Sequence, residues 1–231
     1  MALFVSAIIP AAGRGVRMGG PVRKPLLTIG GRPILLHTLR NLVRVREIGE
    51  IILVVNPKDV QLVQKELGQE LTDLRVSAVI AGGRERFDSV KRGLAHLDDR
   101  ATLVLVHDAV RPFVPAKLIR QVIARAQKTG AAILAIPVND TLKEVRGRRI
   151  KRTLERGSLW LAQTPQVFRR ELIEKAYAGH KPAGVSDDAR LIELMGKPVA
   201  VVAGSPLNFK ITIPEDLVLA RTLAGEPVKG A

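Results

Sequence analysis

The most informative stretch is residues 3–25, which read Leu3-Phe-Val-Ser-Ala-Ile-Ile-Pro-Ala-Ala-Gly-Arg-Gly-Val-Arg-Met-Gly-Gly-Pro-Val-Arg-Lys-Pro25. The run Leu3–Ile9 is short, apolar and rich in β-branched residues, which predicts a buried strand. A long loop of small residues follows it directly, carries Arg17 and ends near Lys24. Because ligands of α/β sheets bind beyond the carboxyl ends of the strands, this loop is a candidate binding site.

The rest of the chain repeats the alternation of an apolar strand with a helical stretch. We expect further strands at Ile51–Val55, Val76–Ile80, Leu103–His107, Ala131–Ile136 and Val199–Ala203, an extended segment at Gln163–Phe168, a short strand at Asn208–Ile211, and helices at Pro33–Val45, Lys58–Leu71, Asp88–Leu97, Pro115–Lys128, Arg169–Ala178, Asp187–Met195 and Pro214–Leu223. This order predicts an α/β fold with a mostly parallel central sheet covered by helices on both faces. No stretch has the composition of a linker, so we expect residues 1–231 to form a single domain.

The alternation breaks after Pro137. Residues 138–158 carry a polar, two-strand pattern around Arg146-Gly147, which predicts a β-hairpin with a basic tip. An isolated hairpin is marginally stable, so we expect this arm to lean on a second subunit and form a homodimer. The alternative is an ordinary surface hairpin.

The chain is strongly basic, with 37 Lys and Arg against 22 Asp and Glu and a formal net charge of +15. Either the protein handles polyanions or it has an Arg-rich surface of solvated charges. Charge alone would allow nucleic acid as a partner. However, aromatic residues make up only 3% of the chain, which disfavours stacking platforms, and no nucleic-acid-binding motif is present. We therefore expect no nucleic-acid partner.

The chain contains no cysteine, which excludes disulfides and thiolate metal sites. No apolar run reaches 18 residues, so we expect no transmembrane helix and no membrane partner. The run Leu3–Ile9 lacks a basic leader and a cleavage site, which argues for a strand instead of a signal peptide. We expect a cytoplasmic location.

The loop Pro10–Gly20 has the features of a phosphate-binding loop. Small residues let the backbone approach a ligand, and successive N–H groups can surround an anion. The loop is not a Walker A motif, because no Gly-Lys-Ser/Thr follows the glycines, and the third glycine of a dinucleotide fingerprint would fall on Met18. Its length and its cations Arg17 and Lys24 favour a triphosphate. The alternative is a surface loop with solubilising charges.

A second glycine-rich cluster, Ala81-Gly-Gly-Arg-Glu-Arg-Phe-Asp-Ser89, follows the predicted strand Val76–Ile80 and so lies at the same edge of the sheet. The Ser89 hydroxyl is suited to contact a base or ribose. Asp88 and Ser89 are equally typical of a helix N-cap.

A third cluster, His107-Asp-Ala-Val-Arg-Pro112, also stands at a strand end. A carboxylate at Asp108 is suited to hold Mg²⁺ or to orient a polar group, and Arg111 can fork onto a phosphate. The alternative is that Asp108 and Arg111 form a structural ion pair. His107 has no partner at metal-ligand spacing, which favours a packing or hydrogen-bonding role.

These clusters occur in one order with several later motifs. The set is Pro10-Ala-Ala-Gly-x-Gly-x-Arg-Met18 with Lys24, Gly82-Gly83 with Asp88-Ser-Val90, His107-Asp-Ala-x-Arg-Pro112, Pro137-Val-x-Asp-Thr141, Leu159-Trp160, Gln163-Thr-Pro-Gln166 and Asn208-Phe-Lys210. It closely resembles the 2-C-methyl-D-erythritol 4-phosphate cytidylyltransferases of the non-mevalonate isoprenoid pathway, from Ala7 to about Ala220.

The resemblance implies a Rossmann-like nucleotidyltransferase fold with a protruding arm that interlocks a homodimer. It implies transfer of CMP from CTP to methylerythritol phosphate, with Mg²⁺ or another divalent cation as cofactor. The catalytic cations would be Arg17, Lys24 and Lys210. The nucleotide would contact Pro10, Ala11, Ala12, Gly13, Arg14, Gly15, Gly82, Gly83, Ser89 and Ala109. The acceptor would contact Asp108, Arg111, Thr141, Arg156, Thr164 and Ser186, some of them across the dimer.

The sequence departs from the family pattern at a few positions. Pro25 stands where Gln is usual, Arg84 where many relatives carry Asp, and Ser186 where Thr is common. These departures keep two alternative acceptors open, ribitol 5-phosphate and another sugar phosphate. Outside this chemistry, the alternatives are a basic nucleic-acid-binding module and a dimeric nucleotide sensor without catalysis.

Overall fold

A seven-stranded sheet organises the protein. The computed structural model describes residues 3–13, 23–179 and 183–226. The strands are β1 (Val5–Ala11), β4 (Ile48–Val55), β5 (Val76–Ala81), β6 (Leu103–Val106), β7 (Ala131–Pro137), β10 (Trp160–Arg169) and β11 (Ala200–Ala203). Their order is β11-β7-β10-β6-β1-β4-β5, and β10 alone among them runs antiparallel to its neighbours. The expected mostly parallel sheet is confirmed.

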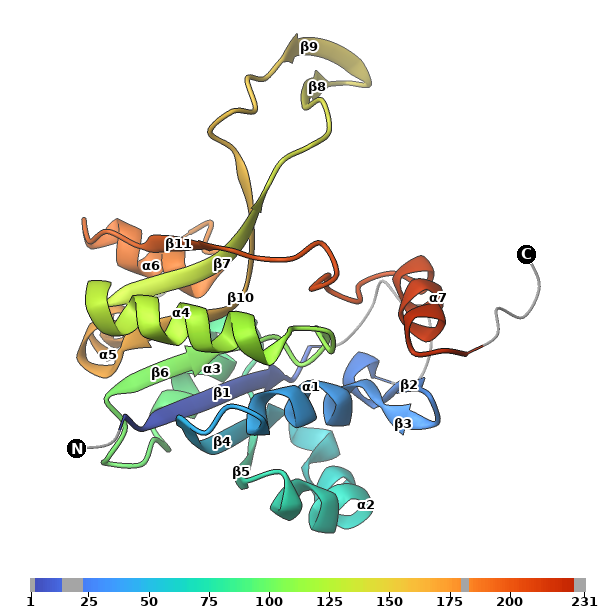
Figure 1. The fold of residues 1–231 in the computed structure, drawn as a ribbon, viewed down its shortest axis with the longest axis vertical. Helices are drawn as coiled ribbons and strands as arrows, with labels where there is room; N and C mark the ends of the chain where they lie inside the picture. The colour runs from blue at the N-terminus through green and yellow to red at the C-terminus, as the bar shows by residue number, and fades with distance from the viewer. Residues whose placement is uncertain (1–2, 14–22, 180–182, 227–231) are drawn as a thin grey trace.

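Helices cover both faces of this sheet (Figure 1). One face packs against α1 (Ile34–Val43), α2 (Val60–Asp73) and α4 (Ala116–Thr129), and the other against α3 (Arg86–Leu94), α5 (Arg170–Ala178) and α6 (Asp188–Leu194). Strand β1 shows why: Ala7 and Ile9 belong to the first core and Ile8 to the second, and all three are fully buried. Successive side chains of a strand point to opposite faces, so a strand covered on both sides must be apolar throughout.

A small third cluster fixes the segment that follows β11. The elements η2 (Lys24–Leu26), β2 (Thr28–Ile29) and β3 (Arg32–Pro33) precede α1, and α7 (Pro214–Leu223) packs beside them. Ile29, Val110, Ile211 and Ala220 share this cluster, and it places the neighbouring Lys210 beside the end of β6.

The expected short strand at Asn208–Ile211 is wrong. These residues lie in no strand. Ile211 N–H donates to the carbonyl oxygen of Val110 (3.0 Å), but the regular series of hydrogen bonds that pairs two strands is not formed there. Side-chain packing of Ile211 holds the segment instead. The remaining expected strands and helices are present, with ends shifted by a few residues; η3 (Pro57–Asp59) precedes α2.

The predicted hairpin is present and projects from the body of the protein (Figure 1). It consists of β8 (Lys143–Arg146) and β9 (Arg149–Thr153). Gly147 and Arg148 join the strands with φ of +54° and +64°, as a two-residue type I′ turn requires. Val145 and Ile150 oppose each other across the two strands, and both are more than half exposed. The arm therefore presents an apolar pair to the outside.

Among the described residues, no helix is both long and apolar enough to cross a membrane.

Two helical glycines provide a test of how closely α3 packs on the sheet. A Cβ at Gly93 would lie 2.6 Å from Cγ2 of Ile8, whereas a Cβ at Gly68 in α2 would meet nothing within 4 Å. We expect Gly93→Ala to lower the free energy of unfolding, because overpacking costs about 1–3 kcal/mol against a gain of about 1 kcal/mol in helix propensity.

The matched change Gly68→Ala should raise the free energy of unfolding by up to about 1 kcal/mol. Urea unfolding of both variants measures the difference. Equal stability of the two would contradict the close contact between α3 and β1.

Candidate functional site

A cleft of about 360 Å³ opens where β1, β5 and β6 end. Carboxyl ends of parallel strands share one edge of a sheet, and the loops that follow these three strands meet there. The residues that line the cleft are Pro10, Ala11, Ala12, Gly13, Lys24, Pro25, Gly83, Arg84, Glu85, Arg86, Ser89, Asp108, Ala109, Val110 and Lys210. The expectation that the three clusters lie at one rim is confirmed.

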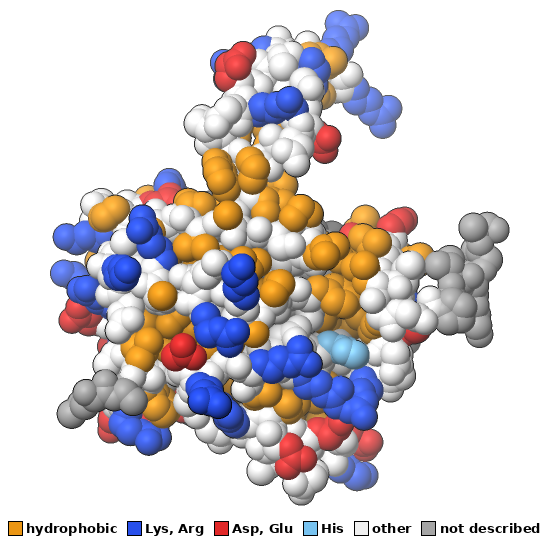
Figure 2. Space-filling view, in the orientation of Figure 1, with side chains coloured by type: hydrophobic (Ala, Val, Ile, Leu, Met, Phe, Trp, Pro, Cys, Tyr) orange, Lys and Arg blue, Asp and Glu red, His pale blue; other side chains and the backbone are white. Residues whose placement is uncertain are grey.

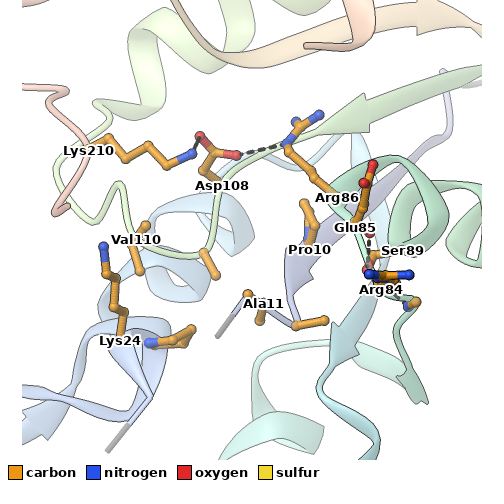
Figure 3. A pocket seen from close by; sticks show the side chains of 15 residues that line it. Pro10, Ala11, Lys24, Arg84, Glu85, Arg86, Ser89, Asp108, Val110 and Lys210 are labelled. Carbon is orange, nitrogen blue, oxygen red and sulfur yellow. Dashed lines mark hydrogen bonds and ion pairs between the residues drawn. The ribbon is translucent and has the colours of Figure 1, made fainter. Parts of the chain in front are cut away.

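Positively charged side chains lie on both sides of the cleft (Figure 3). In Figure 3, Lys24, Val110 and Lys210 lie on one side, Arg84 and Ser89 lie on the other, and Pro10 and Ala11 lie between them. Lys24 begins η2, and its Nζ donates to the carbonyl oxygen of Thr212. Lys24 and Lys210, which come from distant segments of the chain, therefore lie on the same side of Pro10 and Ala11 (Figure 3).

The first loop and the glycine pair pack closely. A Cβ at Gly82 would lie 2.4 Å from Cβ of Ala12 and 2.8 Å from Oγ of Ser89, so only glycine fits. Gly82 is buried and does not line the cleft, whereas Gly83 does. The structural contribution of Gly82 is thus to let the loops after β1 and β5 approach each other.

Ser89 is held in place by the same loop. Its Oγ accepts from the N–H of Gly83 (3.2 Å) and donates to the carbonyl oxygen of Glu85 (3.1 Å). The alternative in which Asp88 or Ser89 is the N-cap residue is wrong, because α3 begins at Arg86. Asp88 lies within the first turn, where its carboxylate accepts from the N–H of Glu85 (3.0 Å).

Asp108 lies at the centre of a cluster of cations. Its Oδ1 is 3.3 Å from Nε of Arg86, and its Oδ2 is 3.0 Å from Nζ of Lys210 and 3.4 Å from Nε of Arg111. The ion pair of Asp108 with Arg111 is therefore present. It belongs to a larger network, of which Figure 3 shows the contacts of Asp108 with Arg86 and Lys210. Burial alone would raise the pKa of Asp108, but the three cations outweigh it and hold the pKa well below its usual range.

His107 and Thr164 anchor the backbone beneath this cluster. The N–H of Asp108 donates to Oγ1 of Thr164 (3.0 Å), which also lies 3.0 Å from Nδ1 of His107. Nε2 of His107 lies 3.2 Å from the carbonyl oxygen of Arg111. Burial lowers the pKa of His107 to about 4, so the ring is neutral at neutral pH. The predicted hydrogen-bonding role of His107 is confirmed.

The donor set does not fit a metal held by Asp108. Both of its oxygens already face cations, which would repel a divalent ion at that position. Among the residues that the structure describes, no group of three or more His, Cys, Asp or Glu side chains is placed to hold a metal ion. The predicted metal-binding role of Asp108 thus has no support in this geometry.

Several predicted site residues stand apart from the lining of this cleft. Arg111 contacts Asp108 and donates to the carbonyl oxygen of Asn208 (2.7 Å). Ser186 lies just before α6, while Thr141 and Arg156 lie at the base of the arm, where Arg156 donates to the carbonyl oxygen of Asn139. The predicted residues Arg14, Gly15 and Arg17 lie outside the described residues.

Sequence reasoning missed Arg86 and Asp188 as members of the site. The two side chains form a forked ion pair, with distances of 2.9 and 2.7 Å between the guanidinium nitrogens and the carboxylate oxygens. Arg86 lies within the second glycine-rich cluster, but its partner is 102 residues away, and no local pattern links them.

Comparison with known proteins identifies the family. A model of the 2-C-methyl-D-erythritol 4-phosphate cytidylyltransferase family matches residues 5–226. The protein of that name from Syntrophus aciditrophicus (strain SB) is 45% identical over 219 residues, which cover 94% of each chain. Among solved structures, 4-diphosphocytidyl-2C-methyl-D-erythritol synthase from Anaerococcus prevotii superposes with a TM-score of 0.83 at 34% identity, covering 97% of both chains. 2-C-methyl-D-erythritol 4-phosphate cytidylyltransferase from Thermus thermophilus gives a TM-score of 0.79 at 38% identity, covering 96% of this chain and 99% of that one. The fold is the Rossmann-like nucleotidyltransferase fold, and the chain belongs to the 2-C-methyl-D-erythritol 4-phosphate cytidylyltransferase family.

Proposed function

We propose that this cleft transfers CMP from CTP to 2-C-methyl-D-erythritol 4-phosphate and releases pyrophosphate. The observation that carries the proposal is the meeting of the loop after β1, Lys24, the Gly83–Ser89 segment and Lys210 in one cleft of a chain from this family. The family match favours methylerythritol phosphate over ribitol 5-phosphate and over a nucleic-acid partner. The product, 4-diphosphocytidyl-2-C-methyl-D-erythritol, is an intermediate of isoprenoid precursor synthesis.

The nucleotide is proposed to lie along the small residues of the first loop. Backbone N–H groups of Ala11–Gly13, continued by Arg14, Gly15 and Arg17, would bind the triphosphate, with Pro10 and Ala109 nearby. The base would lie at Gly83 and Ser89, on the side of the cleft away from Lys24. Gly82 would act through the close packing that it allows.

The acceptor is proposed to lie at the Asp108 end of the cleft. Lys210 lines this end and pairs with Asp108, which also pairs with Arg111. Ser186 would contribute a hydroxyl. Thr164 would act through the backbone of Asp108, to which its hydroxyl is already hydrogen-bonded.

The reaction needs no nucleophile from the protein. A phosphate oxygen of the acceptor forms the new bond to the α-phosphorus of CTP in line with the bond to the β-phosphate, which breaks and releases pyrophosphate. Catalysis then rests on positioning and on neutralising charge that grows on the α-phosphate oxygens and the leaving group. Arg17, Lys24 and Lys210 are proposed to supply that charge.

We propose Mg²⁺, or another divalent cation, as the cofactor, bound to the phosphates of the nucleotide. In nucleotide sites Mg²⁺ binds mainly through substrate phosphates and water, which would require no cage of carboxylates from this chain. The cytoplasmic location stays a prediction.

We also propose that residues 1–231 are one domain that dimerises through the arm. Support comes from the exposed Val145 and Ile150 on a two-stranded sheet that projects from the body, and from Trp160 and Leu161 at its base. Figure 2 shows hydrophobic side chains gathered where the arm joins the body. A partner subunit would cover these side chains and bring Thr141 and Arg156 to the cleft of its neighbour.

A pyrophosphate-release assay tests the proposed reaction. With each of the four NTPs against methylerythritol phosphate, ribitol 5-phosphate and hexose phosphates, we expect efficient release only with CTP and methylerythritol phosphate. Lys24→Met should lower kcat roughly 10²–10³-fold, because one charge that stabilises the transition state is lost.

The control is Lys175→Met, the same change at an exposed site on α5, which should leave kcat unchanged. Preference for another acceptor, or wild-type kcat in Lys24→Met, would contradict the assignment. Thermal unfolding of both variants verifies that they are folded.

Mixed dimers test the arm. Lys24→Met lacks a cleft residue and Arg156→Ala lacks an arm residue, so each homodimer should be nearly inactive. In a mixed dimer one site has both residues intact, and co-expression should restore about a quarter of wild-type activity, since half of the dimers are mixed and one site in two works.

Co-expression of two cleft variants, Lys24→Met with Lys210→Met, is the matched control and should restore nothing. Native mass spectrometry counts the mixed dimers. Mixed dimers without activity in the first pair, or a wild-type chain that is active as a monomer, would refute the shared site.

A further inference from the structure

Arg86 joins two carboxylates that come from different parts of the chain. It contacts both oxygens of Asp188, at 2.9 and 2.7 Å, and its Nε is 3.3 Å from Oδ1 of Asp108. Asp188 is fully buried, and the Arg86 side chain retains 27% of its exposure, on the wall of the cleft. Burial would lower the pKa of Arg86, but the two carboxylates raise it, so the guanidinium keeps its charge.

The Asp188 end of this bridge is held independently of Arg86. The N–H groups of Asp188 and Ala189 donate to Oε1 of Gln166, at 3.1 and 3.0 Å. The hydroxyl of Tyr177 donates to Oδ1 of Asp188, and the Tyr177 ring stacks on Phe87, the neighbour of Arg86, with 4.7 Å between ring centroids. Arg86 of α3 and Tyr177 of α5 therefore contact the buried carboxylate of Asp188, while Gln166 of β10 holds the backbone at the start of α6.

At the Asp108 end, the orientation of the carboxylate depends on Arg86. Lys210 and Arg111 share Oδ2, so Arg86 is the partner that fixes Oδ1 among the contacts of the described residues. A carboxylate held at both oxygens has a fixed plane, whereas one held at a single oxygen can turn about its terminal torsion. Arg86, held by Asp188, therefore fixes Oδ1 of Asp108 relative to α6.

We propose that Arg86 is a positioning residue for the transfer reaction, which orients the Asp108 carboxylate toward the acceptor by bracing it against Asp188 of α6. This inference rests on the proposed acceptor end of the cleft. Arg is required because only a planar fork can hold one carboxylate with two nitrogens while a third contacts another.

Steady-state kinetics of Arg86→Lys tests the inference. Lysine keeps the charge and loses the fork, so kcat/KM for the acceptor should fall about 10–100-fold, the scale of a misplacement near 1 Å. The KM for CTP should change less than about threefold, because other contacts hold Lys24 and Ser89 in place. Arg190→Lys, the same change in an exposed pair with Glu193 on α6, is the control and should behave as wild type.

A milder variant guards against a simple loss of folding. Asp188→Asn keeps the shape and an oxygen for the Tyr177 hydroxyl but removes the charge that holds the fork, so it should lower kcat/KM for the acceptor in the same selective way. A wild-type kcat/KM for the acceptor in either Arg86→Lys or Asp188→Asn would overturn the proposal. The proposal would also be overturned if kcat/KM fell equally for CTP and for the acceptor and the unfolding temperature fell with it. That result would show that the contact contributes only to stability. A failure of the proposed function would appear instead as a wild-type enzyme that releases no pyrophosphate from CTP and methylerythritol phosphate.

Discussion

The Asp108 carboxylate and the three cations around it hold together the parts of the molecule that make the cleft. Asp108 stands at the end of β6, Arg86 comes from α3, Arg111 from the loop that follows β6, and Lys210 from the segment after β11. Burying such a cluster costs desolvation free energy that its attractions roughly offset, so it adds little net stability. Its effect is geometric, because each side chain has its place fixed by the others.

The sheet supplies the other constraint. Parallel strands place their carboxyl ends along one edge of the sheet. The loops after β1, β5 and β6 therefore meet there without any specific pairing between distant residues. Small residues then decide how close the loops come. Gly82 packs against Ala12 at a distance that no side chain would allow, and this contact keeps the loop after β1 against the Gly83–Ser89 segment. The polar network and the tight backbone packing together leave a preformed cleft.

The sequence predicts most of this arrangement because most of it is local. Apolar strands, amphipathic helices and the glycine-rich loops that follow the strands are recognisable within windows of about ten residues, and the rule for strand ends gathers the loops. Lys210 is found only through the resemblance of an ordered set of motifs. The pair of Arg86 with Asp188 cannot be found in this way, because partners 102 residues apart leave no trace in spacing. The segment Asn208–Ile211 has an alternating pattern that suits a strand, but it packs its side chains without a ladder. Thr141 and Arg156 lie at the base of the arm and do not line the cleft of their own chain.

The decisive experiment is a crystal structure with methylerythritol phosphate and a CTP analogue that cannot be cleaved at the α–β bridge. We expect the triphosphate against Ala11–Gly13 and Lys24, the base at Gly83 and Ser89, and the acceptor at Asp108 and Lys210, with the Arg86 fork unchanged. An acceptor bound elsewhere, or a triphosphate remote from Lys24, would contradict this expectation.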